Sequence, residues 1–468
     1  MYFVGIIKYK HMRSQQKIKF DNLSKQSFEN KERKYILSNN INKYIKKFVD
    51  GKKQFSNYDG ARKKLHYLKF KAIEQIDKLL QEFDISFTER GGKFLYASDS
   101  EEALKYIGNI IIKEDAQSIV KAKSMVCEEI GLEEYLKKRK IKFLETDLGE
   151  FLVQLAEEKP SHIISPALHK SKKEIYDLLN NKYDQSFDEK TNVEEVVRFV
   201  RQLLREEFLN ADIGISGCNF LISDIGAVSI TENEGNAILS TSMPKTHIVV
   251  TTIEKVLPNL NNLELFLTML ATHGTGQNLS VYNSLILGPS KTSDNPQNIY
   301  VIVVDNGRSQ LLEDTTLRES LYCIKCGACH NHCPVYKSIG GHTYDSVYNG
   351  PIGSIISPFI FGKSEFMHLP FASTLCGKCN EVCPVKINIT NLLIYTRKKL
   401  LDEKYRDNID KYIHKRMQYF LKKRKRMDMF SAKIKNIGLK ISLRNNWGVK
   451  KSIPKFAENS FNKLQKQK

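Results

Sequence analysis

Seven of the nine cysteines lie within 61 residues of one another and form two motifs. The first, CIKCGACHNHCP, has the spacing C-x2-C-x2-C-x3-C-P, and the second is CGKCNEVCP, with 42 residues between Cys333 and Cys376. Three thiolates at three-residue intervals let one short loop surround an iron–sulfur cluster. A four-cysteine zinc site is the alternative, but it needs only paired C-x2-C units. The spacing therefore predicts iron–sulfur chemistry, and the odd cysteine count argues against a disulfide framework.

The two motifs predict a crossed pairing of ligands. In two-cluster ferredoxins the cysteine before the proline binds the other cluster. This rule assigns one cluster to Cys323, Cys326, Cys329 and Cys383, and the other to Cys333, Cys376 and Cys379. The second set is one thiolate short, and a repeated C-x2-C spacing would place that thiolate at Val382. We expect a 4Fe-4S first cluster and a second cluster that is 4Fe-4S or 3Fe-4S.

Other residues are open as the fourth ligand of the second cluster. No spacing distinguishes among Cys127, Cys218, His330, His332 and His342. For Cys127 and Cys218 we favour the role of small buried hydrophobic residues.

A glycine-rich segment, residues 211–236, is a candidate for a second site. Its glycines interrupt apolar runs at predicted strand ends, where ligands bind in open α/β sheets. The segment ends in TENEGN, so Glu232 and Glu234 are candidate ligand-binding residues. The alternative is that these glycines only form turns. The segment has neither the G-x-G-x-x-G order nor a Walker A lysine, so it does not predict a nucleotide site.

Strand-like and helix-like segments alternate from about residue 71 to Asp305. The expected strands are KFLYA (93–97), SIVKAKS (118–124), KFLETD (142–147), SHIISPA (161–167), THIVVTTI (246–253) and IYVIVVD, which ends at Asp305. Amphipathic helical segments separate them. This alternation predicts an α/β domain with a largely parallel sheet.

The net charge of +20 is concentrated at the two ends of the chain. Residues 1–70 hold 18 Lys and Arg against 5 Asp and Glu, and residues 401–468 hold 20 against 6. We interpret the ends as solvated basic helices, the sharpest cluster being Lys422 to Arg426. Docking to an acidic partner or an anionic membrane surface is the alternative, and nucleic-acid binding is the least favoured.

The chain shows no sequence signal for a membrane or for secretion. The longest run without a charged residue, 265–290, has a polar centre, so we expect no transmembrane segment. The N-terminus does not fit a secretory signal, and we place the protein in the cytoplasm. The first 11 residues look like an extra leader before Met12.

Taken together, these segments resemble the lactate utilization protein B family of LUD-domain iron–sulfur proteins. The resemblance covers about residues 70–400 in one order and is carried by KAKSMVCEEIGL (121–132), ADIGISGCNF (211–220), ENEGN (232–236), VVDNGRS (303–309), both cysteine motifs and GGHTYDSVYNGPIG (340–353). The TENEGN stretch also resembles the nucleophile loop of coenzyme A transferases, although we expect binding rather than covalent chemistry there.

The resemblance implies a fold, a function and partners. The fold is an α/β LUD domain, with a sheet like that of sugar isomerases and coenzyme A transferases, followed by an α-helical two-cluster ferredoxin domain. We expect a basic N-terminal helical arm at 1–70, the LUD domain at 71–305, the ferredoxin domain at 306–400 and a basic tail at 401–468. The implied function is electron transfer in a cytoplasmic complex that oxidises L-lactate to pyruvate, with a cysteine-rich-repeat protein and a second LUD protein as partners. A LUD-domain ligand-binding or redox-sensing regulator is the alternative, and catalytic residues stay unknown.

Overall fold

The computed structural model describes residues 14–158, 160, 166–167, 169–292, 294–403, 415–416, 418–427, 429–443, 452–459 and 464–465. The chain divides into two units, Met1–Leu400 and Leu401–Lys468. Both cysteine motifs and the predicted LUD segment belong to the first unit.

A six-stranded sheet forms the centre of the α/β part, with the order β1-β10-β7-β4-β2-β3 and all neighbours parallel. The strands are β1 (Lys93–Ala97), β2 (Ser118–Lys121), β3 (Lys142–Glu145), β4 (Ile213–Ser216), β7 (Thr246–Thr252) and β10 (Asn298–Val304). Every residue of β4 and β7 is buried, which explains their unbroken apolar runs. The predicted parallel α/β sheet is confirmed. Of the strand expected at 161–167, residues 161–165 lie outside the described residues.

A smaller sheet lies beside the first, in the order β8-β5-β6-β9. Its strands are β5 (Phe220–Ile222), β6 (Ala227–Glu232), β8 (Val256–Leu257) and β9 (Tyr282–Ile286). The glycines expected in loops have two different roles, turn formation and close packing. Gly226 has a positive φ of 51° in the β5–β6 turn, whereas Gly214 lies inside β4. An added Cβ at Gly214 would meet the Ser240 carbonyl oxygen at 1.8 Å, so this glycine permits close packing rather than a turn.

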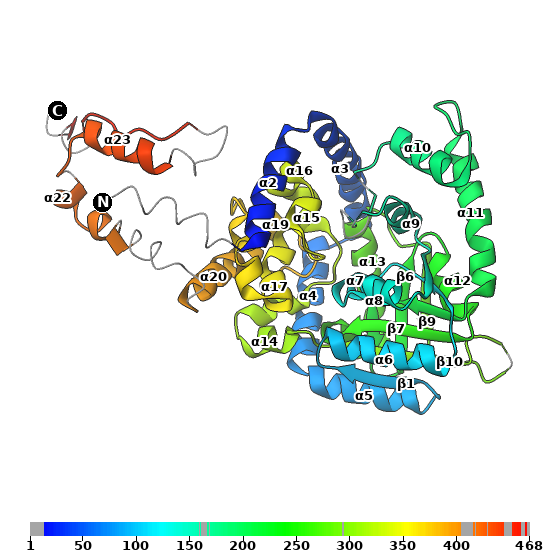
Figure 1. The fold of residues 1–468 in the computed structure, drawn as a ribbon. Coiled ribbons are helices and arrows are strands. Elements are labelled where there is room, and N and C mark those ends of the chain that lie inside the picture. Colours follow the sequence, from blue (N-terminus) through cyan, green and yellow to red (C-terminus); the bar gives the residue numbers. More distant parts are fainter. Residues whose placement is uncertain are drawn as a thin grey trace. The chain divides into compact units, whose positions relative to one another are not determined.

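Helices cover the sheet on both faces, and Figure 1 shows α5 and α6 running beside β1. They are α5 (Ile76–Thr88), α6 (Ser100–Lys113), α7 (Met125–Glu129), α8 (Leu132–Lys138), α9 (Leu148–Leu155), α10 (Lys172–Tyr183), α11 (Val193–Asn210), α12 (Asn236–Ser242), α13 (Leu263–Gly274) and the 3-10 turns η2 (Ile253–Lys255) and η3 (Leu260–Asn262). Side chains fix several of their starts. Ser171 and Glu174 form a reciprocal capping box at α10.

The described residues 306–403 contain helices and turns but no strand. The elements are α14 (Arg308–Glu313), η4 (Leu317–Tyr322), α15 (Ala328–His332), α16 (Pro334–Ile339), η5 (His342–Tyr344), α17 (Gly350–Phe361), α18 (Lys363–Phe366), η6 (Leu369–Phe371), α19 (Lys378–Val382) and α20 (Ile389–Asp402). One apolar core runs from the sheet into this part, since Val249 and Ile324 belong to the same cluster of buried residues. The predicted α-helical second part is confirmed.

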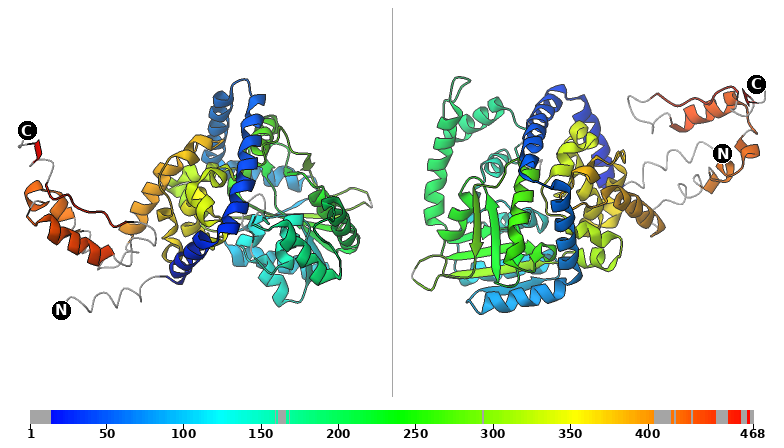
Figure 2. Two further views of the ribbon diagram at one scale, coloured as in Figure 1. Left: turned by 90° about the horizontal axis from the view of Figure 1, so that it is seen from above. Right: turned by 180° about the vertical axis from the view of Figure 1, so that it is seen from behind.

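The basic N-terminal segment is helical, in α2 (Gln15–Glu29), α3 (Lys31–Gly51), η1 (Lys52–Gln54) and α4 (Tyr58–Glu74). It is not a separate arm. Figure 2 shows α2 and α3 lying along the helices of the cysteine motifs, and they contact α15, α16 and α18. Buried Leu37, Phe48 and Leu65 hold these helices in place. The sequence missed this because so few apolar residues, among many lysines, are used to make the contacts.

The second unit contains α22 (Arg424–Met427) and α23 (Ala432–Leu443) among its described residues. Lys422, Lys423 and Arg424 of the predicted basic cluster are exposed. Across the described part of the chain, every helix is too short or too polar to span a bilayer.

Candidate functional site

The two cysteine motifs fold as repeats of one loop. Each loop has two residues with left-handed backbone around a cysteine, and these are Lys325 and Gly327 in the first loop and Leu375 and Gly377 in the second. Each loop then enters a five-residue helix, α15 or α19, and ends at a Cys-Pro pair. The two helices contact each other. The shared conformation therefore matches positions that lie 50 residues apart, such as Cys326 and Cys376.

A first group of thiols includes a cysteine from the second motif. Burial raises the pKa of Cys326 well above its ordinary value, and the nearby thiols of Cys323 and Cys383 raise it further. Burial also raises the pKa of Cys383 to about 12, again with Cys323 close by. Burial raises the pKa of Cys329 well above its ordinary value, and the thiols of Cys323, Cys326 and Cys383 raise it further. The structure thus brings Cys383 to three cysteines that precede it by 54 to 60 positions, as the crossover rule predicts.

A second group consists of Cys333, Cys376 and Cys379. Burial raises the pKa of Cys333, and Cys376 raises it further. Burial raises the pKa of Cys379 to about 11, with Cys333 adding to the effect. The Cys379 thiol also raises the pKa of Cys329 in the first group. These two cysteines lie on α19 and α15, which contact each other, so the two groups lie side by side. That these seven residues ligate iron stays a prediction.

The surroundings of the thiols fit iron–sulfur clusters. The backbone N–H of Lys325 donates to Cys323 Sγ at 3.4 Å, and the N–H of Ile387 donates to Cys383 Sγ at 3.4 Å. Such bonds stabilise the negative charge that a thiolate carries when it binds iron. Thiols also favour iron–sulfur clusters or zinc over hard cations. The donor set therefore fits the predicted cofactor.

The register of the loops corrects the position of the missing thiolate. Counting from Cys376 placed it at Val382, but Val382 ends α19 just as His332 ends α15. The two loops show that Cys376 matches Cys326, not Cys323. The position without a thiol is therefore the first of the second motif, Ser373.

The other proposed fourth ligands occupy varied places. Cys127 is buried in the core beneath the parallel sheet. Cys218 Sγ lies 3.0 Å from Thr251 Oγ1. His342 lies with Glu158 and His169, with ligand atoms within 4.8 Å of one another. His330 and His332 lie on α15: the His330 ring stacks on Tyr336 at 5.2 Å, and His332 Nδ1 is 2.9 Å from the Ala328 carbonyl oxygen.

Helix α4 supports the second motif through a buried arginine. Arg62 donates to the Cys383 carbonyl oxygen from Nε at 2.9 Å and from a terminal nitrogen at 2.8 Å. His66 Nδ1 lies 2.8 Å from the Val385 carbonyl oxygen. No sequence pattern predicted a functional role for this helix, and no spacing linked Arg62 to a cysteine 321 positions away.

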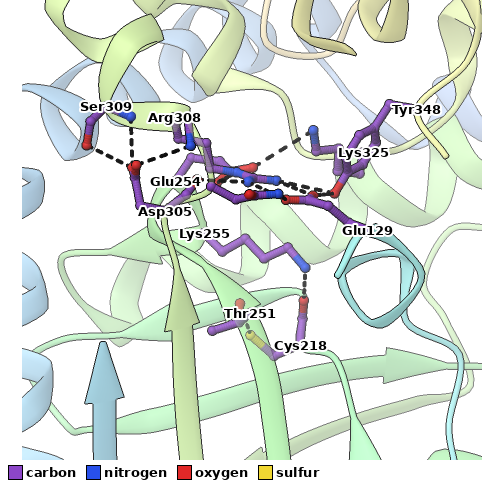
Figure 3. Close-up of polar contacts among 12 residues, drawn as sticks. Glu129, Cys218, Thr251, Glu254, Lys255, Asp305, Arg308, Ser309, Lys325 and Tyr348 are labelled. Carbon is purple, nitrogen blue, oxygen red and sulfur yellow. Dashed lines mark hydrogen bonds and ion pairs between the residues drawn. The ribbon is translucent and has the colours of Figure 1, made fainter. Parts of the chain in front are cut away.

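A buried ionic network joins the sheet to the first motif (Figure 3). Arg308, at the start of α14, forms two hydrogen bonds with the Glu129 carboxylate, at 2.8 and 2.7 Å, and its Nε pairs with Glu254 at 2.8 Å. Tyr348 donates to the same Glu129 carboxylate at 2.6 Å. Burial opposes the charge on Glu254, but Arg308 lowers the pKa of Glu254 to about 2. Lys325 lies over the Tyr348 ring, at 4.4 Å, so the network reaches the cysteine loop.

Glu254 and Arg308 follow the carboxyl ends of neighbouring strands, β7 and β10. Ligands bind at this edge in open parallel sheets. Glu129 and Arg308 lie within KAKSMVCEEIGL and VVDNGRS, segments that carried the family resemblance, but their pairing needed the fold.

A cavity of about 150 Å³ lies at the same edge, between the sheet and the first cysteine loop. Its charged and sulfur-bearing wall includes Lys69, Cys218, Glu232, Glu254, Lys255, Cys323 and Lys325. Phe220, Leu270 and Ile324 supply apolar wall. Lys255 Nζ donates to the Cys218 carbonyl oxygen at 2.7 Å.

The two predicted ligand-loop glutamates bond to helix N-termini. Glu232 accepts the backbone N–H groups of Ala237 and Ile238 in α12, at 2.7 and 2.8 Å. Glu234 accepts the N–H of Leu148 in α9, at 3.3 Å. Carboxylates are favoured there by the helix dipole. Glu232 also lines the cavity, whereas a binding role for either glutamate stays a prediction.

Two further histidines, His169 and His273, have polar partners in the fold. His273 is buried between the Met269 carbonyl oxygen and the Tyr58 hydroxyl, each 2.7 Å from a ring nitrogen. Burial lowers the pKa of His273 to about 3, so its ring is neutral. His169 pairs with Glu158 at 2.7 Å.

Comparison with known proteins agrees with this architecture. Residues 80–304 match the LUD domain model, and residues 319–387 match the 4Fe-4S dicluster domain model. "Lactate utilization protein B" of Bacillus subtilis (strain 168) is 40% identical over 361 residues, which cover 76% of this chain and 75% of that protein. The chain belongs to the lactate utilization protein B family. The family member from Oceanobacillus iheyensis is 39% identical over 77% of this chain and 75% of its own length.

An Escherichia coli (strain K12) relative, the "Uncharacterized electron transport protein YkgF", is 38% identical over 76% of this chain and 74% of its own length. The lactate utilization protein B family thus supports a role in lactate utilization and electron transfer, with iron–sulfur clusters as the cofactor.

Proposed function

We propose that this protein is the iron–sulfur electron-transfer subunit of a cytoplasmic complex that oxidises L-lactate to pyruvate. The observation that carries the proposal is the adjacency of the two thiol groups, in which Cys379 lies near Cys329. Two neighbouring clusters supply one-electron redox chemistry when bound. The first group would hold a 4Fe-4S cluster, and the three-cysteine group a 4Fe-4S or 3Fe-4S cluster.

The chain's own residues position this path. Arg62 fixes the carbonyl of Cys383, and the Glu129–Arg308 pair ties the sheet to the loop of the first group. Cys376 is exposed, so the second group reaches the surface there, and we expect electrons to enter or leave at this cluster. We expect the partners to be a cysteine-rich-repeat protein and a second LUD-domain protein, with the basic ends available for docking.

Redox sensing is the second candidate function. It is favoured by the cavity that Cys323 shares with the sheet, because a bound ligand there would touch both parts. In this case the protein would bind a ligand or report redox state without passing electrons from lactate.

Anaerobic reconstitution distinguishes these functions. We expect about seven to eight irons per chain, with matching sulfide, from two clusters. With the two partner proteins added, L-lactate should reduce both clusters at a rate that matches turnover. Reduction by dithionite but not by lactate in the assembled complex would favour sensing. Bound zinc without acid-labile sulfide would refute both.

A further inference from the structure

The cavity between the sheet and the first cysteine loop has three lysines and two carboxylates in its wall. Its two carboxylates have other partners: Glu254 pairs with Arg308, which also binds Glu129, and Glu232 accepts two N–H groups at the start of α12. The ammonium of Lys255 instead contacts a backbone carbonyl, that of Cys218. Among the described residues, Lys255 forms no ion pair within 4.0 Å of a carboxylate.

Lys255 is the decisive cation. Lys69 is buried and contacts the Glu254 carbonyl oxygen, but it lies near Cys323 and so offsets the charge of that thiolate. The groups that act most strongly on Lys255 are Cys218, Glu254, Lys325 and Arg308, none of them among the seven cysteines assigned to the two clusters. Lys255 is half-buried, and an ammonium that has lost part of its water without gaining an anion is destabilised. A ligand with a negative charge would remove that cost.

The size and lining of the cavity restrict the ligand. Its volume of about 150 Å³ is well below the roughly 300–1,000 Å³ typical of pockets for drug-sized ligands, so it suits a smaller molecule. Phe220 and Leu270 offer apolar contact, while Glu232 and Glu254 disfavour a dianion such as phosphate. A short-chain monocarboxylate is small, has an apolar chain and carries a single negative charge, so it fits the volume, the apolar wall and the charges of the cavity.

We infer that this cavity binds a small monocarboxylate, of the 2-hydroxy acid or 2-oxo acid class, with its carboxylate at Lys255 and its chain against Phe220 and Leu270. The choice of lactate and pyruvate as probes rests on the proposed function. The bound acid lies beside the loop of Cys323, so binding and the first cluster influence each other.

Calorimetry with the anaerobically purified, cluster-loaded full chain tests the inference. L-lactate or pyruvate should bind, and Lys255→Met should weaken binding at least tenfold while iron and sulfide contents stay unchanged. Lys93→Met is the matched control, because Lys93 likewise donates to neutral oxygens, those of Asn298 and Tyr300, but lies on β1. Ala271→Leu, which fills part of the cavity, should weaken binding as well.

A second readout is the cluster signal. Saturating pyruvate should shift the EPR spectrum of the first cluster, and Lys255→Met should abolish the shift. The inference is overturned if neither acid binds, if inorganic phosphate binds more tightly, or if Lys255→Met binds like the parent protein. In each case two intact, lactate-reducible clusters in the complex would leave the proposed function standing.

An independent observation concerns the second cluster, and it also rests on the proposed iron–sulfur function. The repeat of the loops places Ser373 where the first motif has Cys323. The N–H of Lys325 donates to Cys323 Sγ at 3.4 Å, and the matching N–H of Leu375 donates to Ser373 Oγ at 3.1 Å. The serine oxygen thus occupies the place of the missing sulfur in the loop.

The structure also holds Ser373 in place. Arg397 donates to its carbonyl oxygen at 3.3 Å and to that of Pro370 at 2.8 Å. We propose that Ser373 Oγ is the fourth ligand of the second cluster. The hydroxyl loses its proton to solvent as the Fe–O bond forms, because metal ligands bind deprotonated.

Two substitutions of Ser373 should change the 3Fe-type EPR signal in opposite directions. Ser373→Cys should supply a fourth thiolate and suppress the 3Fe-type EPR signal that forms in air. Ser373→Ala should make that signal appear several-fold faster, whereas Thr374→Ala, at the exposed neighbouring hydroxyl, should not. Equal rates in the parent, Ser373→Cys and Ser373→Ala proteins would overturn the assignment, while an intact first cluster would leave the proposed function untouched.

Discussion

The two cysteine groups share a loop but differ in their surroundings. In the first group, Cys326 and Cys383 are buried, and the loop joins the Arg308 network and the cavity at the sheet edge. In the second group, Cys333 and Cys379 are buried but Cys376 is exposed, and the first position holds a serine. The first loop therefore packs against the LUD domain, whereas the second reaches the protein surface at Cys376. From this asymmetry we expect ligand coupling at the first cluster and exchange with partners at the second.

Cys383→Ala should have the largest effect on the difference between the two cysteine groups. Cys383 belongs to the second motif in sequence but to the first thiol group in space. Its loss should remove the buried cluster and roughly half of the iron, as measured by iron analysis and EPR. Cys127→Ala, in the core beneath the sheet, should keep all the iron. Loss of only the Cys376 and Cys379 signal would show that the pairing is wrong.

Arg308→Met should uncouple the first group from the sheet. It leaves the buried carboxylates of Glu129 and Glu254 without their cation, and such a loss costs about 3–5 kcal/mol. The midpoint of urea unfolding should fall accordingly.

The matched control for Arg308 is Arg318→Met, which breaks a partly exposed pair with Glu74. Its cost should stay below about 1 kcal/mol. Similar costs for the two variants would mean that the buried network does not join the two parts.

Cys333→Ala should affect the surface cluster alone. Air-exposed parent protein should show a 3Fe-type EPR signal that disappears on anaerobic treatment with ferrous iron. Cys333→Ala should lose this signal while the first cluster persists, because Cys333 lies with Cys376 rather than with Cys323. Two air-stable 4Fe-4S clusters in the parent would remove the asymmetry.

The smallest expected effect is a pH dependence of acid binding to the cavity. Burial lowers the pKa of Lys255 below its ordinary value, with Cys218, Glu254, Lys325 and Arg308 around it. The ammonium is present below this lowered pKa and is lost as the pH rises through it. Calorimetry should therefore show pyruvate affinity falling as the medium becomes alkaline. The fall should be absent from Lys255→Met, and an equal fall in both proteins would assign it to another group.

Sequence spacing alone predicted the iron–sulfur chemistry, because the ligands of one loop lie close together along the chain. Alternating apolar segments likewise predicted the parallel sheet. The crossover rule predicted that Cys383 joins the first group, and the fold places it there. Spacing failed at Val382 because the second motif lacks its first cysteine. The count therefore began at Cys376, the second ligand position of the loop, instead of at Ser373, the first.

Only the tertiary structure decided which distant residues meet. Arg62 reaches Cys383, Arg308 reaches Glu129, and Lys255 faces the loop of Cys323 across a cavity. Lone charged residues in a lysine-rich chain have no periodicity that marks them as buried. Their roles come from the desolvation and pairing that the packed sheet, helix α4 and the cysteine loops impose, and these contacts arise only once segments hundreds of residues apart have folded together.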